Sequence, residues 1–207
     1  MNILTDSLDQ IKEASTAEPV LEVIRHRWSP RGLSGEPLPM NVIRAIVEAG
    51  RWAPSAFNEQ PWRVMVGIKP DTTWQGIADT LDPFNQVWAT VAPVLMLVSG
   101  KKFYSHNHTP NRHYAYDTGQ MVAYMSLEAR SHNVFCHQMA GFDPVKAAET
   151  FGISTEEYDP LVVVAFAYRG TTDHLNDNLR QRESAPRTRK EASEIAFQNT
   201  FGEGLGW

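Results

Sequence analysis

Three short, almost unbroken apolar runs limit the folds open to this chain more than any other feature. They are Val64–Ile68, Val94–Val98 and Leu161–Ala167, and each is rich in strand-forming residues. Runs of this length and continuity are typical of strands that are covered on both faces. Residues 134–138 are a candidate fourth strand. We therefore expect a buried central sheet.

Between these runs, apolar residues repeat at helical spacing. The predicted helices cover residues 17–27, 39–52, 73–82, 84–91, 113–132 and 144–151. The longest of them carries small residues such as Gly119 and Ala123, which suit a central, tightly packed helix. The alternation of helices and strands indicates an α/β or α+β protein whose sheet is covered by helices.

The composition narrows the class of protein. A chain of 207 residues suits a single domain, 1–207, and 19 Lys and Arg against 24 Asp and Glu give a net charge of −5, which disfavours a general nucleic-acid binder. The single cysteine excludes an internal disulfide or a multi-cysteine metal site within one chain. The first ten residues do not resemble a secretory signal, and the apolar stretch 87–98 is too short to cross a bilayer. We expect a cytoplasmic protein that binds neither nucleic acid nor membrane.

Two terminal segments do not fit a compact core. Residues 1–16 predict a polar helix with little to bury, and residues 169–207 predict an extended arm. The arm carries Phe197, Phe201 and Trp207. Exposed aromatic residues usually dock on another surface, and a second copy of the same chain is the simplest candidate.

Arginines gather in two turn segments that lie far apart in the sequence. Arg25, Arg27 and Arg31 belong to the first, and Arg187 and Arg189 to the second. The guanidinium fork makes paired, charge-assisted hydrogen bonds with phosphate oxygens, so the two clusters could converge on one anion. Solvated surface charge is the alternative interpretation.

Residues 52–62 form a second candidate binding segment, with the sequence Trp-Ala-Pro-Ser-Ala-Phe-Asn-Glu-Gln-Pro-Trp. A proline ends the preceding helix, and amide side chains follow before the next strand begins. Asn58 and Gln60 each offer donors and an acceptor, which are the groups needed to bind the edge of a heteroaromatic ring. Their alternative role is to form a turn.

Several other patterns carry less weight. There is no P-loop, H-E-x-x-H or G-x-S-x-G, and the glycine-rich run 202–206 precedes no helix, so we interpret it as a flexible tail. The segment with His106, His108 and His113 could bind a metal, but a loop over a substrate pocket is the favoured interpretation, and no metal is expected. Cys136 lies in an apolar run and is expected to be an inert core thiol.

Taken together, these segments resemble the nitroreductase family of FMN-dependent oxidoreductases. Residues 27–31, Arg-Trp-Ser-Pro-Arg, are similar to its R-x-S-x-R/K motif, and residues 53–62 to its A-P-S-x-x-N-x-Q-P-W. Further similarities follow in the family's order over about residues 20–200: N-x-x-W at 85–88 before A-P at 92–93, the central helix at 117–129, G-F-D at 141–143 and the basic pair at 187–189. The resemblance implies an α+β fold with a helix-covered, mixed central sheet and an intertwined homodimer.

The resemblance also implies two FMN sites at the dimer interface, each lined by both subunits. One subunit would hold the phosphate and ribityl chain, the other would approach the flavin ring from the loop 54–60, and the backbone at 138–141 would lie beside the reactive edge of the ring. Arg31 would stabilise the negative charge of reduced flavin. The residues assigned in this way are Arg27, Trp28, Ser29, Arg31, Pro54, Ser55, Asn58, Gln60, Asn85, Gln138, Met139, Ala140, Gly141, Arg187 and Arg189.

Two positions depart from the family pattern. Asn133 follows the long helix where the family often has Gly, and Asn can adopt the same left-handed backbone. Ala140 stands where some members carry Glu near the flavin. The expected fold is unaffected, but the choice of substrate is left open.

The expected activity is hydride transfer from NADH or NADPH through FMN to an electron-poor planar acceptor, such as a nitroaromatic, a quinone or free flavin, by a ping-pong mechanism. The flavin performs the redox chemistry, so no catalytic triad or carboxylate pair is needed. Two flavin alternatives remain open, an oxidase or dehydrogenase for a specific metabolite and a non-catalytic flavin-binding protein. A metal-binding protein that uses the histidine segment is the third.

Overall fold

A computed structural model describes residues 7–206 of the chain. It is an α+β protein built around one sheet, as expected. The helices are α1 Ser7–Ile11, α2 Glu22–His26, α3 Met40–Arg51, α4 Thr72–Thr80, α5 Pro83–Ala89, α6 Tyr114–Ser131, α7 Pro144–Phe151 and α8 Asp177–Ser184, with short 3₁₀ turns η1 Ala56–Asn58 and η2 Ala192–Glu194. The strands are β1 Trp62–Ile68, β2 Val94–Lys101, β3 Phe135–Met139 and β4 Tyr158–Ala167.

The four strands lie in the order β1-β2-β4-β3. We expected a mixed sheet, and the structure differs in this detail, because the pairings β1 with β2, β2 with β4 and β3 with β4 are all antiparallel. Continuous apolar runs report burial on both faces, and burial does not determine strand direction.

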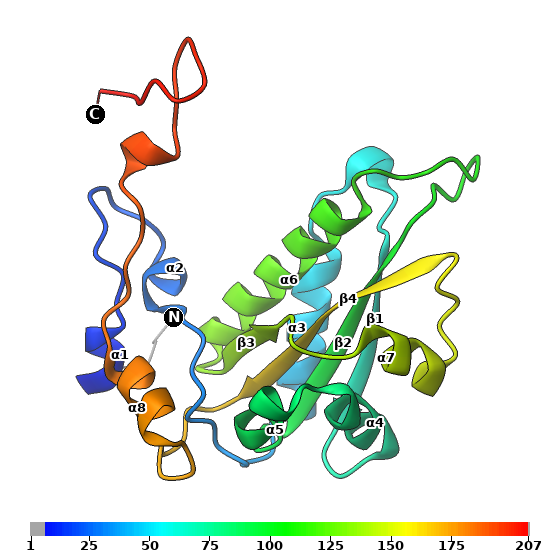
Figure 1. The fold of residues 1–207 in the computed structure, drawn as a ribbon, viewed down its shortest axis with the longest axis horizontal. Coiled ribbons are helices and arrows are strands. Elements are labelled where there is room, and N and C mark those ends of the chain that lie inside the picture. Colours follow the sequence, from blue (N-terminus) through cyan, green and yellow to red (C-terminus); the bar gives the residue numbers. More distant parts are fainter. Residues whose placement is uncertain (1–6, 207) are drawn as a thin grey trace.

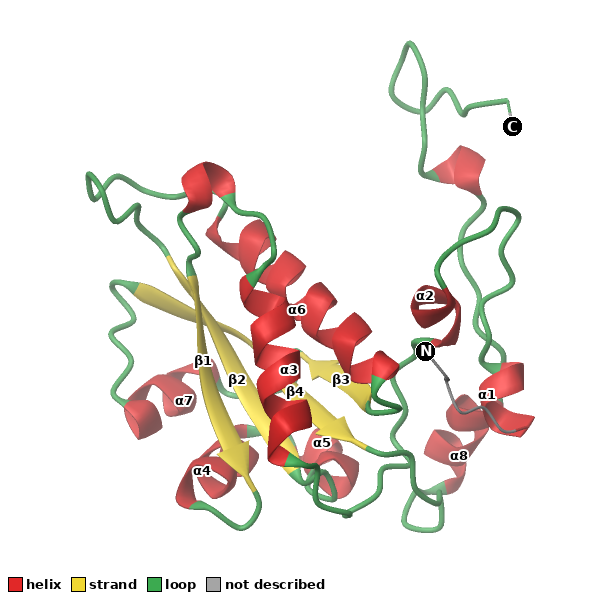
Figure 2. Ribbon diagram, turned by 180° about the vertical axis from the view of Figure 1, so that it is seen from behind, coloured by secondary structure: helices red, strands yellow, loops and turns green. Residues whose placement is uncertain are grey.

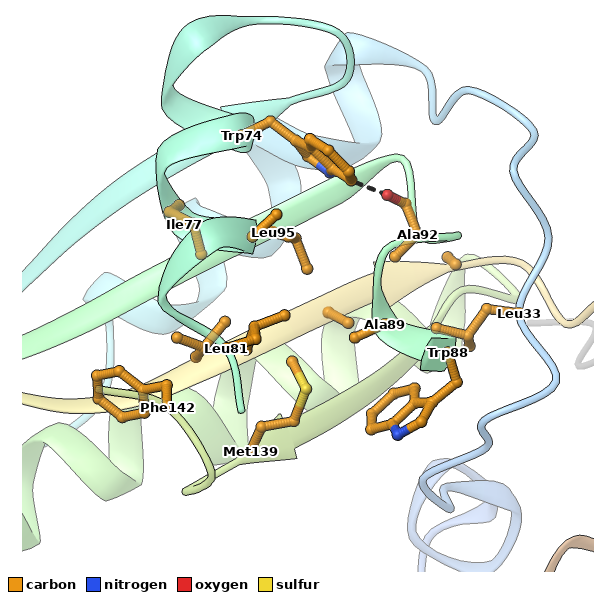
Figure 3. Packing of buried hydrophobic residues seen from close by; sticks show 14 of the residues in the cluster. Leu33, Trp74, Ile77, Leu81, Trp88, Ala89, Ala92, Leu95, Met139 and Phe142 are labelled. Carbon is orange, nitrogen blue, oxygen red and sulfur yellow. Dashed lines mark hydrogen bonds between the residues drawn. The ribbon is translucent and has the colours of Figure 1, made fainter. Parts of the chain in front are cut away.

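Helices cover both faces of the sheet, with α3 and α6 on one and α4, α5 and α7 on the other (Figures 1 and 2). Side chains alternate along each strand, so Met96 and Val98 of β2 pack under α3 and α6, whereas Leu95 and Leu97 face the second layer. In that second layer Trp74 of α4 and Trp88 of α5 are buried, and the Trp74 indole donates to the Ala92 carbonyl at 3.0 Å (Figure 3). Each face of the sheet therefore has its own hydrophobic core.

Local signals set the ends of several helices. Asp71 accepts a hydrogen bond from Trp74 N at the start of α4, and Asp143 accepts from two backbone N–H groups at the start of α7. Gly152 ends α7 with a left-handed backbone, φ 62°. The predicted helix 17–27 is shorter in the structure, where α2 begins only at Glu22, after Pro19.

The terminal segments pack together beside the sheet. Within the predicted helix 1–16, the structure describes α1, and residues 1–6 lie outside the described part, as does Trp207. Helix α8 interrupts the predicted arm 169–207 and is anchored by the buried Leu175 and Leu179. Beyond α8 the chain runs away from the sheet and its helices (Figure 1), with Ile195 and Phe201 exposed.

Candidate functional site

The two arginine clusters converge on one cavity of about 260 Å³. Arg27 and Arg31 of the first cluster lie in the turn that follows α2, and the second cluster lies in the extended segment that follows α8. Arg25 does not join them, because it lies within α2 and pairs with Glu13 and Glu22. Six residues expected from the sequence line this cavity: Arg27, Trp28, Ser29, Arg31, Arg187 and Arg189. Lys12, Arg182 and Glu183 also line it and were not expected.

The N-terminal segment and the end of α8 form one wall of the cavity. Lys12 is buried, and its Nζ donates to the carbonyls of Arg182 at 3.0 Å and Ala185 at 2.5 Å. In return, Arg187 Nη1 donates to the carbonyls of Lys12 at 2.9 Å and Arg25 at 3.0 Å. These contacts join segments more than 160 residues apart, which no local sequence pattern reports.

The cavity has a large surplus of positive charge. Six basic side chains line it against the single carboxylate of Glu183. Burial lowers the pKa of Arg27 and Arg187, and repulsion from neighbouring arginines lowers the pKa of both further. Arg31 Nε is buried and has no hydrogen-bond partner within residues 7–206. An anion with several acceptor oxygens would relieve both the repulsion and the missing hydrogen bond.

Arg31 packs against Trp88, and Trp88 packs against His137. The Arg31 guanidinium lies 5.5 Å from the centre of the Trp88 ring, and Trp88 lies 4.3 Å from the ring of His137. Burial lowers the pKa of His137 to about 4, an effect that the Pro30 carbonyl opposes and the nearby Arg31 reinforces. The ring is therefore neutral near pH 7, and its Nδ1–H donates to the Pro30 carbonyl at 2.8 Å.

The loop 54–60 has a strained backbone. Phe57, Asn58 and Gln60 have φ values of 55°, 54° and 50°, although none is glycine. The Ser55 hydroxyl accepts from Gln60 N at 3.0 Å and holds this shape, while Pro54 and the Asn58 and Gln60 side chains remain exposed. Strained backbone of this kind is often retained where a ligand requires it.

This loop lies far from the arginine cavity within one chain. Ala56 N donates to Asp117 at the start of α6, whereas Arg130 near the end of α6 donates to the carbonyl of His26, beside the first arginine turn. The 13 residues from Asp117 to Arg130 correspond to about 20 Å of helix (Figure 2). The loop and the cavity therefore lie at opposite ends of α6.

The segment 138–141 ends β3 and is fixed by its backbone. The Gly141 carbonyl accepts from Asp82 N at 3.0 Å and from Asn85 Nδ2 at 2.9 Å. A Cβ at Gly141 would lie 2.5 Å from Asn85 Nδ2, so a side chain does not fit there without a shift. Asn85 therefore supports this segment. Met139 is buried in the core, whereas Gln138 and Ala140 are exposed.

The histidine segment does not form a metal site in the described part of the chain, where no group of three or more His, Cys, Asp or Glu could hold an ion. Instead, His108 stacks on Phe103 at 4.7 Å, and His106 packs against Phe57 and Tyr104. Glu59 accepts from both the backbone N and the hydroxyl of Ser105. The segment thus packs beside the strained loop and leaves Phe57, Asn58 and Gln60 exposed.

The burial of the cysteine determines its reactivity. Cys136 is fully buried with its Sγ 3.0 Å from the Ser126 hydroxyl, and burial raises its pKa to about 11, so the thiol is unreactive.

Across residues 7–206, no helix has the length and apolar character needed to cross a membrane.

Comparison with known proteins gives consistent matches. The model of the nitroreductase family matches residues 24–79. The uncharacterized 15.4 kDa protein in the ask 5′ region of Mycolicibacterium smegmatis is 30% identical over 135 residues, which cover 65% of this chain and 88% of that protein. An NADH dehydrogenase of Thermus thermophilus is 24% identical over 168 residues, covering 66% of this chain and 80% of that protein. The crystal structure of an oxidoreductase containing FMN has a TM-score of 0.86 at 28% identity and covers 96% of this chain and 98% of that one.

Proposed function

Because the chain belongs to the nitroreductase family, we propose that it is an FMN-dependent oxidoreductase that takes hydride from NADH or NADPH. The proposed acceptors are electron-poor planar molecules: nitroaromatics, quinones or free flavin. Bound FMN would supply the redox chemistry, taking hydride from the nicotinamide and passing it to the acceptor in a ping-pong sequence. The protein itself would bind, orient and shield the reacting groups.

The cationic cavity is the observation that carries this proposal. Its surplus of basic side chains and the unpartnered Arg31 Nε suit the phosphate of FMN. Its volume of about 260 Å³ lies below the roughly 300–1,000 Å³ typical of pockets that enclose a whole ligand. The cavity therefore suits one end of the cofactor, and the flavin ring needs further walls.

We propose that a second copy of the chain provides those walls. The loop 54–60 lies at the opposite end of α6 from the cavity, so it cannot close over a cofactor held in its own chain. In a homodimer, Pro54, Ser55, Asn58 and Gln60 of one subunit would meet the cavity of the other. The apolar groove between α2, α3 and α6, about 700 Å³ and lined by Leu21, Tyr124 and Leu127, is available for such a contact.

A spectroscopic experiment tests the activity. The purified protein is expected to show the visible absorbance of oxidised flavin and to lose it when NADH or NADPH is added without oxygen. Adding a nitroarene or a quinone should restore the absorbance. Retention of colour in the presence of both nicotinamides would favour a flavin-binding protein without reductase activity.

Substitution of Arg189 tests the phosphate site. Arg189→Ala should weaken FMN binding by about 1.5–3 kcal/mol, the usual contribution of a hydrogen bond to a charged group. The dissociation constant, measured by flavin fluorescence, should rise roughly 10- to 100-fold. Lys190→Ala removes the same charge one residue further along, outside the cavity lining, and should leave binding unchanged. Full FMN occupancy of Arg189→Ala with intact circular dichroism would exclude the assignment.

Substitution of Ala140 tests how many kinds of acceptor the protein reduces. A small exposed residue at this position leaves space and no charge beside the proposed ring, so several planar acceptors should react within roughly two orders of magnitude of one another. Ala140→Glu should change the order of acceptors or the nicotinamide preference more than it changes FMN affinity. Steady-state kinetics with a nitroarene, a quinone and free flavin measure this. Activity on one acceptor alone, or an unchanged order, would favour an enzyme for a specific metabolite.

A further inference from the structure

A carboxylate inside a cavity proposed to bind phosphate needs an explanation. Glu183 lines the cavity together with six basic side chains, and it is only 3% exposed. A negative charge at this position repels a phosphate, so it works against the binding that the surrounding cations favour. The Glu183 carboxylate must therefore have a role other than direct binding of the phosphate.

The hydrogen bonds of Glu183 indicate that role. Its Oε1 accepts from the backbone N–H of Arg31 and of Gly32, both at 2.9 Å, and its Oε2 accepts from the same Arg31 N–H at 3.1 Å. These two residues end the turn that carries Arg27, Ser29 and Arg31 into the cavity. Helix α8 holds Glu183 rigidly, because Asn176 caps its start and Leu179 is buried beneath it.

The charge of Glu183 also acts on the cations around it. Burial lowers the pKa of Lys12, Arg31 and Arg169, and in each case the Glu183 carboxylate opposes that shift. These cations come from the N-terminal segment, the first arginine turn and the residues after β4. One carboxylate thus favours the charged form of basic groups from three parts of the chain.

We propose that Glu183 is a fixed counter-charge of the FMN phosphate site, which holds the basic side chains together when no phosphate is bound and limits the affinity when one is. This inference rests on the proposed function. Two consequences follow from the charge alone. Removing it should make the flavin-free protein less stable, and it should make phosphate binding tighter, because one repulsion is lost.

Glu183→Gln separates the charge from the geometry. The amide oxygen can take the place of Oε1 and accept from both backbone N–H groups, so only the longer contact of Arg31 N with Oε2, at 3.1 Å, is lost. Asp177→Asn is the matched control, because it removes one negative charge from the exposed side of the same helix. The ligands are FMN and riboflavin, which differ only in the phosphate.

The expected result for Glu183→Gln is a lower melting temperature of the flavin-free protein and an FMN dissociation constant about five- to tenfold lower than that of the wild type. Riboflavin affinity should be unchanged, and Asp177→Asn should match the wild type in every measurement. A merely structural role would change the affinities for FMN and riboflavin together. Unchanged or weaker FMN binding by Glu183→Gln, against a wild type that prefers FMN to riboflavin, overturns the counter-charge and leaves the proposed function standing.

A wild type that binds FMN no better than riboflavin overturns both the phosphate site and the counter-charge. If Glu183→Gln does not fold without flavin, refolding in the presence of each ligand decides the question. Recovery with FMN and not with riboflavin supports the proposal. Equal recovery with both, or none, contradicts it.

Discussion

At the scale of single residues, His137 shows how the protein supports a charged group with neutral ones. It lies under Trp88, which in turn lies under Arg31, and its burial places the pKa of the ring near 4. A protonated imidazole at this position would repel the arginines of the cavity. The low pKa keeps the ring neutral and its Nδ1–H directed at the Pro30 carbonyl, which fixes the turn at Pro30.

This burial predicts a pH dependence of stability. The folded pKa of His137 lies below the usual value of about 6.5, so between about pH 6.5 and pH 4 the unfolded chain binds more protons than the native one. The stabilisation is complete above that window and is lost as the pH falls through it, by up to about 1.4 kcal/mol per unit. Urea unfolding at several pH values should show this loss in the wild type and a shallower dependence in His137→Gln. Substitution of the exposed His174 by Gln is the control, and equal slopes in all three proteins would contradict the prediction.

The site residues that could be predicted from the sequence are those in local motifs. Arg27, Ser29 and Arg31 lie within one turn, and Arg187 and Arg189 within another, so each group is visible as a pattern. Lys12 and Glu183 carry no such signal, because they reach the cavity only through the packing of α8 against the N-terminal segment. Charged residues in polar helices usually face solvent, and only the tertiary contact distinguishes these two.

At the scale of elements, the sheet and its helices are more predictable than the segments around them. The predicted helix 144–151 has the observed bounds, and the bounds of the helix 113–132 differ by one residue at each end. Their apolar periodicity is determined by burial against the sheet. Helix α8 was missed because only Leu179 among its eight residues is an apolar core residue, so its periodicity is too weak to detect.

The contact between β1 and α4 gives a prediction at this scale. Gly67 lies against the backbone of α4, and a Cβ there would come within 2.4 Å of Trp74 Cα. Gly67→Ala should therefore push α4 from the sheet edge and lower the free energy of unfolding by about 1–3 kcal/mol. Gly119 is exposed on α6, and a Cβ there meets no atom within 4 Å in the described chain, so its expected role in tight packing is wrong. Gly119→Ala should therefore be neutral or stabilising by up to about 1 kcal/mol. Denaturant unfolding compares the two variants. Equal changes in the free energy of unfolding would contradict the prediction, because α4 would then move away from Gly67 at little cost.

At the scale of the whole molecule, the exposed arm and the proposed cofactor site lead to the same expectation. Ile195 and Phe201 are 67% and 93% exposed, and the arm that carries them extends away from the sheet and its helices (Figure 2). Apolar side chains presented in this way usually belong to an interface. The proposed division of the site between the two ends of α6 leads to a partner as well.

We therefore predict a stable dimer whose dissociation releases FMN. Sedimentation equilibrium should show the dimer at micromolar concentration. Ile195→Asp should weaken both dimerisation and FMN retention, because it places a charge in the interface. Lys190→Ala, nearby on the same arm, should change neither. A flavin-loaded monomer that persists at micromolar concentration would refute the shared site.

Cys136 makes the opening of this protein measurable without the introduction of another cysteine. The thiol lies beneath α6, so a thiol-reactive dye can modify it only after α6 separates from β3 or the chain unfolds. No second cysteine competes for the dye, so the signal reports one event per chain. At saturating dye the labelling rate equals the opening rate, and at low dye it reports the equilibrium between closed and open forms. The same purified sample can thus show how often α6 separates from β3, and whether bound flavin makes this separation rarer.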